Sequence, residues 1–172
     1  MNPGGRMLTA MTEPGVEVHA AVSAPPDRVW DLVSDITLMP GFSTELQSVA
    51  WAEGFDGPGL GAEFLGSNSN PAIGDWTTRS RIVEFDPPRV FAWAVGDPAA
   101  PAALWRFELV PATDGTRLRY AARIGPGKSG VTMLIDRAPD RATEIVARRL
   151  RQLLAGMETT VAGIKKLAES GS

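Results

Sequence analysis

One long amphipathic segment near the C-terminal end most limits how this chain can fold. From Pro139 to Glu169, apolar residues recur every three or four positions, and no further proline interrupts them. This spacing places the apolar side chains on one stripe of a helix. A helix of about 30 residues is roughly 45 Å long and is stable in water only when its apolar stripe is covered. We therefore expect a second layer of structure to pack along this helix.

The rest of the chain carries strand patterns rather than further long helices. Alternating residues predict strands at 16–23, 46–52, 62–68, 76–85, 90–95, 104–110 and 116–124, and two short helices, near 26–33 and 35–41, follow the first strand. Strands joined by short turns favour an antiparallel sheet, because parallel pairs need crossover helices. The sequence therefore predicts an α+β fold, with a curved antiparallel sheet of six to seven strands wrapped around the long C-terminal helix.

Length and charge narrow the functional classes. With 172 residues, 44% of them apolar, the chain is long enough for one domain with a sizeable core. We expect a flexible tail at residues 1–14 and a single domain at 15–170. A net charge of −3 argues against a nucleic-acid partner, and no run of 18 apolar residues marks an integral membrane segment. A cytoplasmic location is the expectation.

The absence of cysteine and the single histidine narrow the possible chemistry. Without cysteine there are no disulfides, thiol nucleophiles or thiolate metal ligands. His19 is out of phase with its apolar neighbours and is expected to face solvent, so sites built from several histidines are nearly excluded. The Gly-Lys-Ser stretch at 127–129 lacks the earlier glycine of a phosphate-binding loop. We therefore expect no metal and no cofactor.

The expected inner face of the sheet combines large aromatic residues with small or polar ones. A dry core rarely uses this mixture, whereas a pocket with apolar walls and a few polar anchors does. The alternative is that the aromatic rings simply fill the space beneath the helix. Together with two methionines near or within the long helix, the candidate ligand-binding residues are Phe64, Asn68, Trp76, Thr78, Ser80, Trp93, Trp105, Phe107, Tyr120, Met133 and Met157.

The segment from Gly125 to Arg137 is a second candidate functional element. It begins with a glycine-rich loop and continues with the largely apolar residues 131–135, directly before the long helix. Two interpretations stay open. It is either a short lid over the mouth of the pocket or a connector that packs on the core.

Several stretches together resemble one protein superfamily. They are APPDRVWDLVSD at 24–35, PGFS at 40–43, GPGLGAEF at 57–64, WTT at 76–78, VEFDPPRVFAW at 83–93, WRFEL at 105–109, GT at 115–116 and GIKKLAE at 163–169. From about Val16 to Glu169 the chain is similar to the START/Bet v1-like (SRPBCC) superfamily, and within it to the bacterial polyketide cyclase/dehydrase-type proteins common in actinobacteria. The resemblance implies a helix-grip fold with a deep cavity between sheet and helix. One departure is Phe42, where many relatives carry tryptophan; its packing role is expected to be kept.

Three functional hypotheses remain, the first two of which follow from the resemblance. Members bind sterols, lipids, polyketides or plant hormones, so the favoured function is binding, for transport or sensing, of a small hydrophobic or amphipathic ligand such as a lipid, fatty acyl or polyketide-like molecule. One alternative is a polyketide aromatase/cyclase-type enzyme, for which Tyr120, Ser80 and Asp75 are the only candidate proton shuttles. The other is a regulatory or toxin-like protein that binds an unknown protein partner through three arginines of the long helix: Arg148, Arg149 and Arg151.

Overall fold

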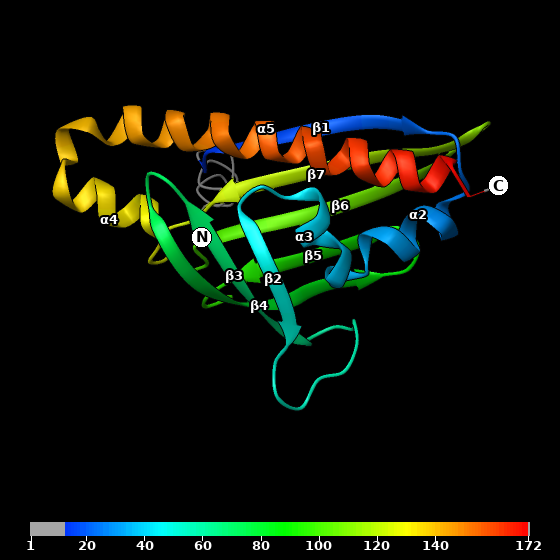
Figure 1. The fold of residues 1–172 in the computed structure, drawn as a ribbon, viewed down its shortest axis with the longest axis horizontal. Helices are drawn as coiled ribbons and strands as arrows, with labels where there is room; N and C mark the ends of the chain where they lie inside the picture. Colours follow the sequence, from blue (N-terminus) through cyan, green and yellow to red (C-terminus); the bar gives the residue numbers. More distant parts are fainter. Residues whose placement is uncertain (1–12, 172) are drawn as a thin grey trace, which may run out of the picture.

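The computed structural model describes residues 13–171, so the expected tail at residues 1–14 lies almost entirely outside the described part of the chain. Along the chain, one strand is followed by short helical segments, by further strands and then by the C-terminal helices (Figure 1). With η for a 3₁₀ helix, the bounds are β1 Gly15–Val22, α2 Pro26–Val33, η1 Ile36–Leu38, α3 Met39–Phe42, β2 Leu46–Trp51, β3 Glu63–Asn70, β4 Gly74–Asp86, β5 Val90–Val95, β6 Ala103–Ala112, β7 Gly115–Ile124, α4 Gly130–Arg137, η2 Pro139–Arg141 and α5 Ala142–Glu169.

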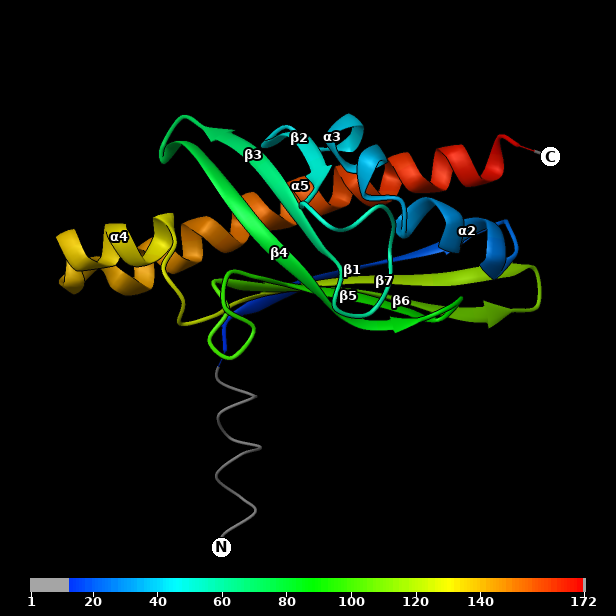
Figure 2. The same ribbon diagram turned by 90° about the horizontal axis from the view of Figure 1, so that it is seen from below.

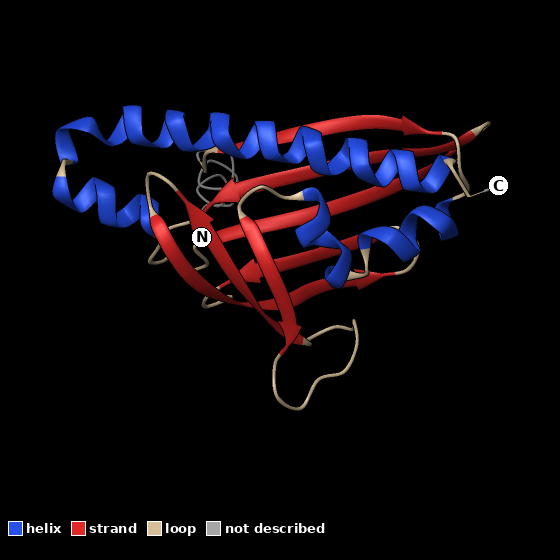
Figure 3. Ribbon diagram, viewed as in Figure 1, coloured by secondary structure: helices blue, strands red, loops and turns tan. Residues whose placement is uncertain are grey.

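Within residues 13–171, the seven strands form one antiparallel sheet in the order β1-β7-β6-β5-β4-β3-β2. Strands β2 to β4 run at a steep angle to the others, so the sheet is strongly bent (Figure 2). The long helix α5 and the short helices α2 and α3 lie on its concave side (Figure 3). The predicted α+β helix-grip arrangement is therefore confirmed, including the short helices directly after the first strand.

The apolar stripe of α5 lies against the sheet, as its periodicity predicts. From residue 153 onward the inward members are buried: Leu153, Met157, Thr160, Val161, Ile164 and Ala168. Hydrogen bonds to other elements hold the C-terminal end. Arg28 Nε donates to the Ala168 carbonyl at 2.6 Å, and Lys165 Nζ donates to the Ala21 carbonyl at 2.7 Å. None of the helices at residues 13–171 combines the length and hydropathy that spanning a membrane requires.

The start of the long helix differs slightly from the prediction. Residues 139–141 form the 3₁₀ helix η2, and α5 begins at Ala142 rather than at Pro139. The backbone of Arg141, with φ −103° and ψ 11°, lies outside the α-helical region and separates the two pieces. Proline still occupies a first helical position, as expected, but of the shorter 3₁₀ turn.

A helix that the sequence pattern did not indicate occupies the segment between β7 and α5. Its N-terminus is set by a capping box, in which the Thr132 N–H donates to the Ser129 hydroxyl and the Ser129 N–H donates to the Thr132 hydroxyl. The glycine loop before it lies tightly against the loop between β5 and β6, because a Cβ at Gly127 would lie 2.5 Å from the Ala100 carbonyl oxygen. These glycines permit close packing and hold the start of α4 in place.

A dense aromatic core fills the space beneath α2 and the C-terminal half of α5. The ring of Trp30 meets those of Phe85 and Phe91 edge-on, with centroids 5.4 and 6.2 Å apart. Phe91 on β5 and Phe107 on β6 have no exposed surface. This end of the molecule is closed and fixes the helix over the sheet.

Candidate functional site

Paired aromatic rings line the concave face of the central strands. Trp93 on β5 lies opposite Trp105 on β6, and their rings stack with centroids 6.1 Å apart and planes 11° apart. Phe107 on β6 lies opposite Tyr120 on β7, and these rings stack at 4.0 Å and 7°. Cross-strand register therefore brings together four aromatic residues that the sequence predicted for one site.

Burial decreases along the inner face toward the end where α5 begins. Phe107 is fully buried, whereas Trp93 and Trp105 retain exposed surface. On the facing helix, no side chain of residues 142–152 is buried, and Val146 and Leu150 are only half-buried against the core. Figure 1 shows this half of α5 at the same end of the molecule as the tip of β5 and the start of β6. The inward side chains are therefore fully buried near α2 and partly exposed near α4, and we call the latter the loosely packed end.

Two hydroxyl groups lie on the inner face without hydrogen-bond partners among the described residues: those of Tyr120 and Ser80, whose residues are 5% and 3% exposed. Burial raises the pKa of the Tyr120 hydroxyl well above its usual value, so the group stays protonated at neutral pH. Every fully buried side-chain oxygen or nitrogen of residues 13–171 has a partner. These two oxygens therefore keep a small accessible surface, at which a ligand or water can bond to them.

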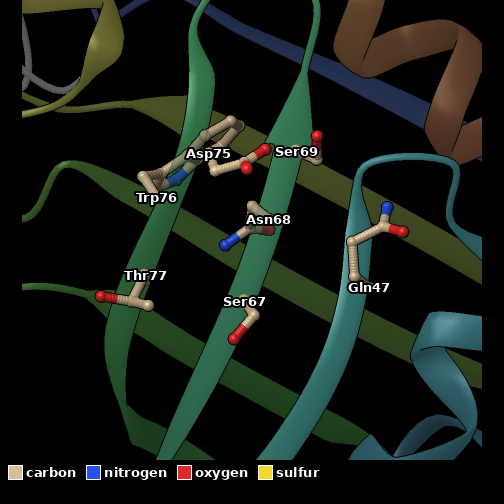
Figure 4. Close-up of a pocket in the computed structure, with 7 residues that line it drawn as sticks. All are labelled: Gln47, Ser67, Asn68, Ser69, Asp75, Trp76 and Thr77. Atoms are coloured by element: carbon tan, nitrogen blue, oxygen red, sulfur yellow. The ribbon is translucent and has the colours of Figure 1, made fainter.

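An open depression of about 610 Å³ lies beside this region, on strands β2 to β4. Figure 4 shows its lining side chains, with Gln47 on β2 and the others on β3 and β4: Ser67, Asn68, Ser69, Asp75, Trp76 and Thr77. The predicted residues Asn68 and Trp76 lie opposite each other in the β3–β4 register. They are half-buried and mark the rim between this polar depression and the aromatic inner face.

The remaining sequence candidates occupy three different environments. Phe64 and Met157 are 7% and 2% exposed and belong to the packed core, while Thr78 is half-buried on β4. Asp75 is exposed and out of phase with the inward side chains of β4, so it lies apart from Tyr120 and Ser80. Met133 is 38% exposed on α4. The structure therefore groups the aromatic and hydroxyl candidates and leaves Asp75 and Met133 outside that group.

Val146 and Leu150 were not among the predicted site residues, although both belong to the apolar stripe of the long helix. Arg149 was predicted to form one basic surface with Arg148 and Arg151. In the structure Arg148 and Arg151 are exposed, whereas Arg149 forms a bidentate ion pair with Glu45 before β2. The helical period distinguishes Arg149 from Arg148 and Arg151. It places Arg149 beside Leu150, at the edge of the apolar stripe.

The convex face of the sheet carries interleaved ion pairs. Glu63 on β3 accepts hydrogen bonds from Arg81 and Arg79 on β4, which hold the pKa of its carboxyl below the usual value. These long side chains lie over small residues, because Arg81 is directly opposite Ala94 in the register of β4 and β5. Ala94 and Ala92 are 1% and 0% exposed, so β5 is covered on both faces. Within the described chain, no group of three histidine or carboxylate side chains is placed to hold a metal ion.

The fold is shared with several solved structures. A Polyketide_cyc-like protein from Corynebacterium glutamicum is 29% identical, with a TM-score of 0.64 over 89% of this chain and 90% of that one. The aromatase/cyclase ZhuI from Streptomyces sp. R1128 is 19% identical, with a TM-score of 0.61 over 91% and 93%. The di-domain aromatase/cyclase StfQ of the steffimycin pathway is 16% identical, with a TM-score of 0.70, and this chain spans 50% of its length.

A search of curated proteins finds no match. Residues 13–162, most of the chain, match the family described as "Polyketide cyclase / dehydrase and lipid transport". This range contains the whole bent sheet, α4 and the greater part of α5. The chain therefore belongs to the polyketide cyclase/dehydrase and lipid transport family.

Proposed function

We propose that the protein binds a small amphipathic ligand between the sheet and the N-terminal half of α5. One observation carries the proposal: half-buried apolar side chains line both walls, among them Trp105 and Leu150. The ring of Tyr120, whose hydroxyl has no hydrogen-bond partner among residues 13–171, lies 5.6 Å from that of Trp105. Native cores are close-packed and satisfy their buried polar groups. This part of the interior departs from both tendencies, which is expected of a site that a bound ligand fills.

The energetics favour a ligand that has both an apolar part and an oxygen. Burying about 300 Å² of apolar ligand surface at roughly 25 cal/mol per Å² contributes about 7 kcal/mol before the costs of association. Micromolar binding requires about 8 kcal/mol net. A ligand oxygen that accepts from the Tyr120 hydroxyl adds roughly 0.5–1.5 kcal/mol and removes an unsatisfied group. A lipid or polyketide-like molecule meets both requirements better than a plain hydrocarbon does.

Native mass spectrometry of the purified protein, followed by organic extraction, tests for a bound molecule directly. Titration with Nile red, a neutral apolar fluorophore, measures the capacity of the site. Trp105→Leu removes part of the half-buried wall and is expected to weaken Nile red binding about tenfold, which corresponds to roughly 60 Å² of lost contact. Trp30→Leu is the matched control at the closed end of the interior. It should lower the melting temperature more and the affinity less.

Two results would contradict the proposal. The first is unchanged Nile red affinity in folded Trp105→Leu protein. The second is an equal loss of affinity in Trp30→Leu, because that change acts on the packed core and not on the site. Either result would mean that the half-buried aromatic wall does not contact the ligand.

An aromatase/cyclase activity is the second candidate, favoured by the protonated Tyr120 hydroxyl next to the aromatic wall. Because burial raises its pKa, this group would donate a hydrogen bond or proton to a substrate oxygen rather than remove a proton. Cyclisation of a poly-β-keto thioester should then be lost in Tyr120→Phe with binding retained. Activity that persists in the double variant Tyr120→Phe/Ser80→Ala would refute it.

A further inference from the structure

A bidentate ion pair joins α5 to the bent part of the sheet at its loosely packed end. Arg149 Nη1 donates to Glu45 Oε2 at 2.7 Å, and Arg149 Nη2 donates to Glu45 Oε1 at 2.6 Å. The Arg149 and Glu45 side chains are 13% and 26% exposed. Asn70 Nδ2, at the end of β3, also donates to Glu45 Oε2 at 3.1 Å. The pair is therefore oriented by three hydrogen bonds and partly shielded from water.

This ion pair has no counterpart elsewhere along the helix. Among the hydrogen bonds and ion pairs of residues 13–171, it is the only one that links α5 to the part of the chain from Ser43 to Asp86, which contains β2, β3 and β4. The other bonds from α5 to distant elements lie at its C-terminal end, where Arg28, Lys165 and Glu169 take part. One end of α5 is therefore held by several contacts, and the gap to β2–β4 is spanned by one.

The two halves of α5 differ in how firmly packing holds them. No residue from 142 to 152 is buried, whereas inward side chains from Leu153 onward are. Gly156 lies close to this boundary, and a Cβ there would meet no atom within 4 Å, so packing does not require a glycine. Glycine in a helix interior weakens it locally. Packing therefore holds the N-terminal half of α5 less firmly than the C-terminal half.

The segment predicted as a possible lid is less suited to opening. The loop before α4 is held by hydrogen bonds from Gly125 to the Ala102 carbonyl and from Gly127 to the Pro101 carbonyl, each 3.0 Å. The start of α4 also lies against the β3–β4 turn, since a Cβ at Gly130 would lie 2.7 Å from the Ile73 side chain. The weaker closure is the one between α5 and the β2 edge.

We propose that the Glu45–Arg149 ion pair is a latch over the portal through which a ligand reaches the aromatic inner face. This inference rests on the function proposed above. When the pair separates, the N-terminal half of α5 moves away from β2 and uncovers Trp105 and Leu150. The latch sets the rates at which a ligand binds and leaves. Because it opens equally for both directions, it has little effect on the affinity itself.

Amide hydrogen exchange of the ligand-free protein tests the latch alone. Arg149→Met keeps an unbranched apolar stem and removes the guanidinium group with its charge. Arg119→Met is the matched control, because Arg119 pairs with Glu17 on the convex face. We expect exchange in residues 142–152 to become about tenfold faster in Arg149→Met, with residues 157–169 unchanged, and no regional change in Arg119→Met. Unchanged or uniformly faster exchange along α5 would overturn the inference.

Stopped-flow binding of Nile red, a neutral probe that does not compete for Arg149, tests the portal. Arg149→Met and Glu45→Gln should raise association and dissociation rates together by about tenfold and leave Kd nearly constant. The charge-swapped double variant Glu45→Arg/Arg149→Glu should restore slow rates. Probe binding with unchanged rates refutes the latch but not the proposed function. Failure of every variant to bind the probe refutes the proposed function and the portal with it, whatever the exchange result.

Discussion

The contact between Phe42 and Gly163 determines whether an alanine at position 163 stabilises or destabilises the protein. Gly163 on α5 faces the ring of Phe42 at the end of α3, and a Cβ there would lie 2.7 Å from Cε1 and 3.2 Å from Cγ. Real Cβ contacts essentially never fall below 3.0 Å, so the ring would have to move. Gly156, on the same helix, has no atom within 4 Å of its virtual Cβ. The two glycines therefore form a matched pair that differs only in its surroundings.

Replacing glycine by alanine should stabilise the protein at position 156 but not at position 163. Alanine in a helix interior is more stable than glycine by about 1 kcal/mol. Gly156→Ala should therefore stabilise the protein by roughly 0.5–1 kcal/mol. At Gly163 the same propensity term is opposed by overpacking, which costs about 1–3 kcal/mol. Gly163→Ala should then lie between neutral and about 2 kcal/mol destabilising, or roughly 1–3 kcal/mol below Gly156→Ala.

Urea denaturation followed by tryptophan fluorescence measures both changes, with the m-value as a check on two-state unfolding. A double-mutant cycle with Phe42→Ala isolates the contact. Once the ring is removed, Gly163→Ala should become stabilising by about the same amount as Gly156→Ala. If Gly163→Ala stabilises the protein in the presence of Phe42, the ring does not hold α5 over the sheet and the reasoning is wrong.

Three further predictions follow from the burial and pKa shifts. Phe107→Ala should cost about 3–5 kcal/mol in urea denaturation, because Phe107 has no exposed surface and stacks on Tyr120; a loss below about 1 kcal/mol would contradict that packing. Tyr120 is the only tyrosine, and burial raises its pKa, so native protein should show no tyrosinate absorbance near pH 10, where urea-unfolded protein ionises. Its contribution to stability is then present below about pH 10 and falls as pH rises further. Arg81 and Arg79 lower the pKa of Glu63, so the free energy of unfolding should fall as pH drops below about 4.5. Glu63→Gln should make stability less dependent on pH in this acidic range. An unchanged pH dependence in the variant would count against the ion pairs.

Most of the fold follows from local periodicity. The apolar stripe of α5 and the alternation in β6 and β7 each indicate which face of the element is buried. Packing the helix on the sheet buries both apolar faces at once. Helix α4 was missed because residues 131–135 are apolar except for Thr132, and so short a segment shows neither the helical nor the strand period. The relevant signal was the Ser129–Thr132 capping box, but threonine is a less familiar partner there than glutamate. The local hydrogen-bond pattern, and not the apolar periodicity, therefore indicates where this helix begins.

The composition of the candidate site could be predicted in part, whereas its open end could not. Alternation places Trp93, Trp105 and Tyr120 on one face, and the register then pairs their rings. Which end of that face is loosely packed depends on tertiary anchors at the end of α5, such as the bond from Arg28 to the Ala168 carbonyl. Likewise, Glu45 and Arg149 are 104 positions apart, beyond the reach of any local pattern.

The ion pairs on the convex face have a mechanical consequence for the whole molecule. Ala92 and Ala94 are buried on the convex side of strand β5, Phe91 is buried on its concave side, and the strand is paired with both β4 and β6. A strand in this position resists bending, since any distortion breaks packing on two faces at once. The sheet is then the more rigid of the two layers. In the function proposed above, the helix rather than the sheet would then adjust to differences in ligand size, so that one backbone shape of the sheet would serve ligands of several lengths.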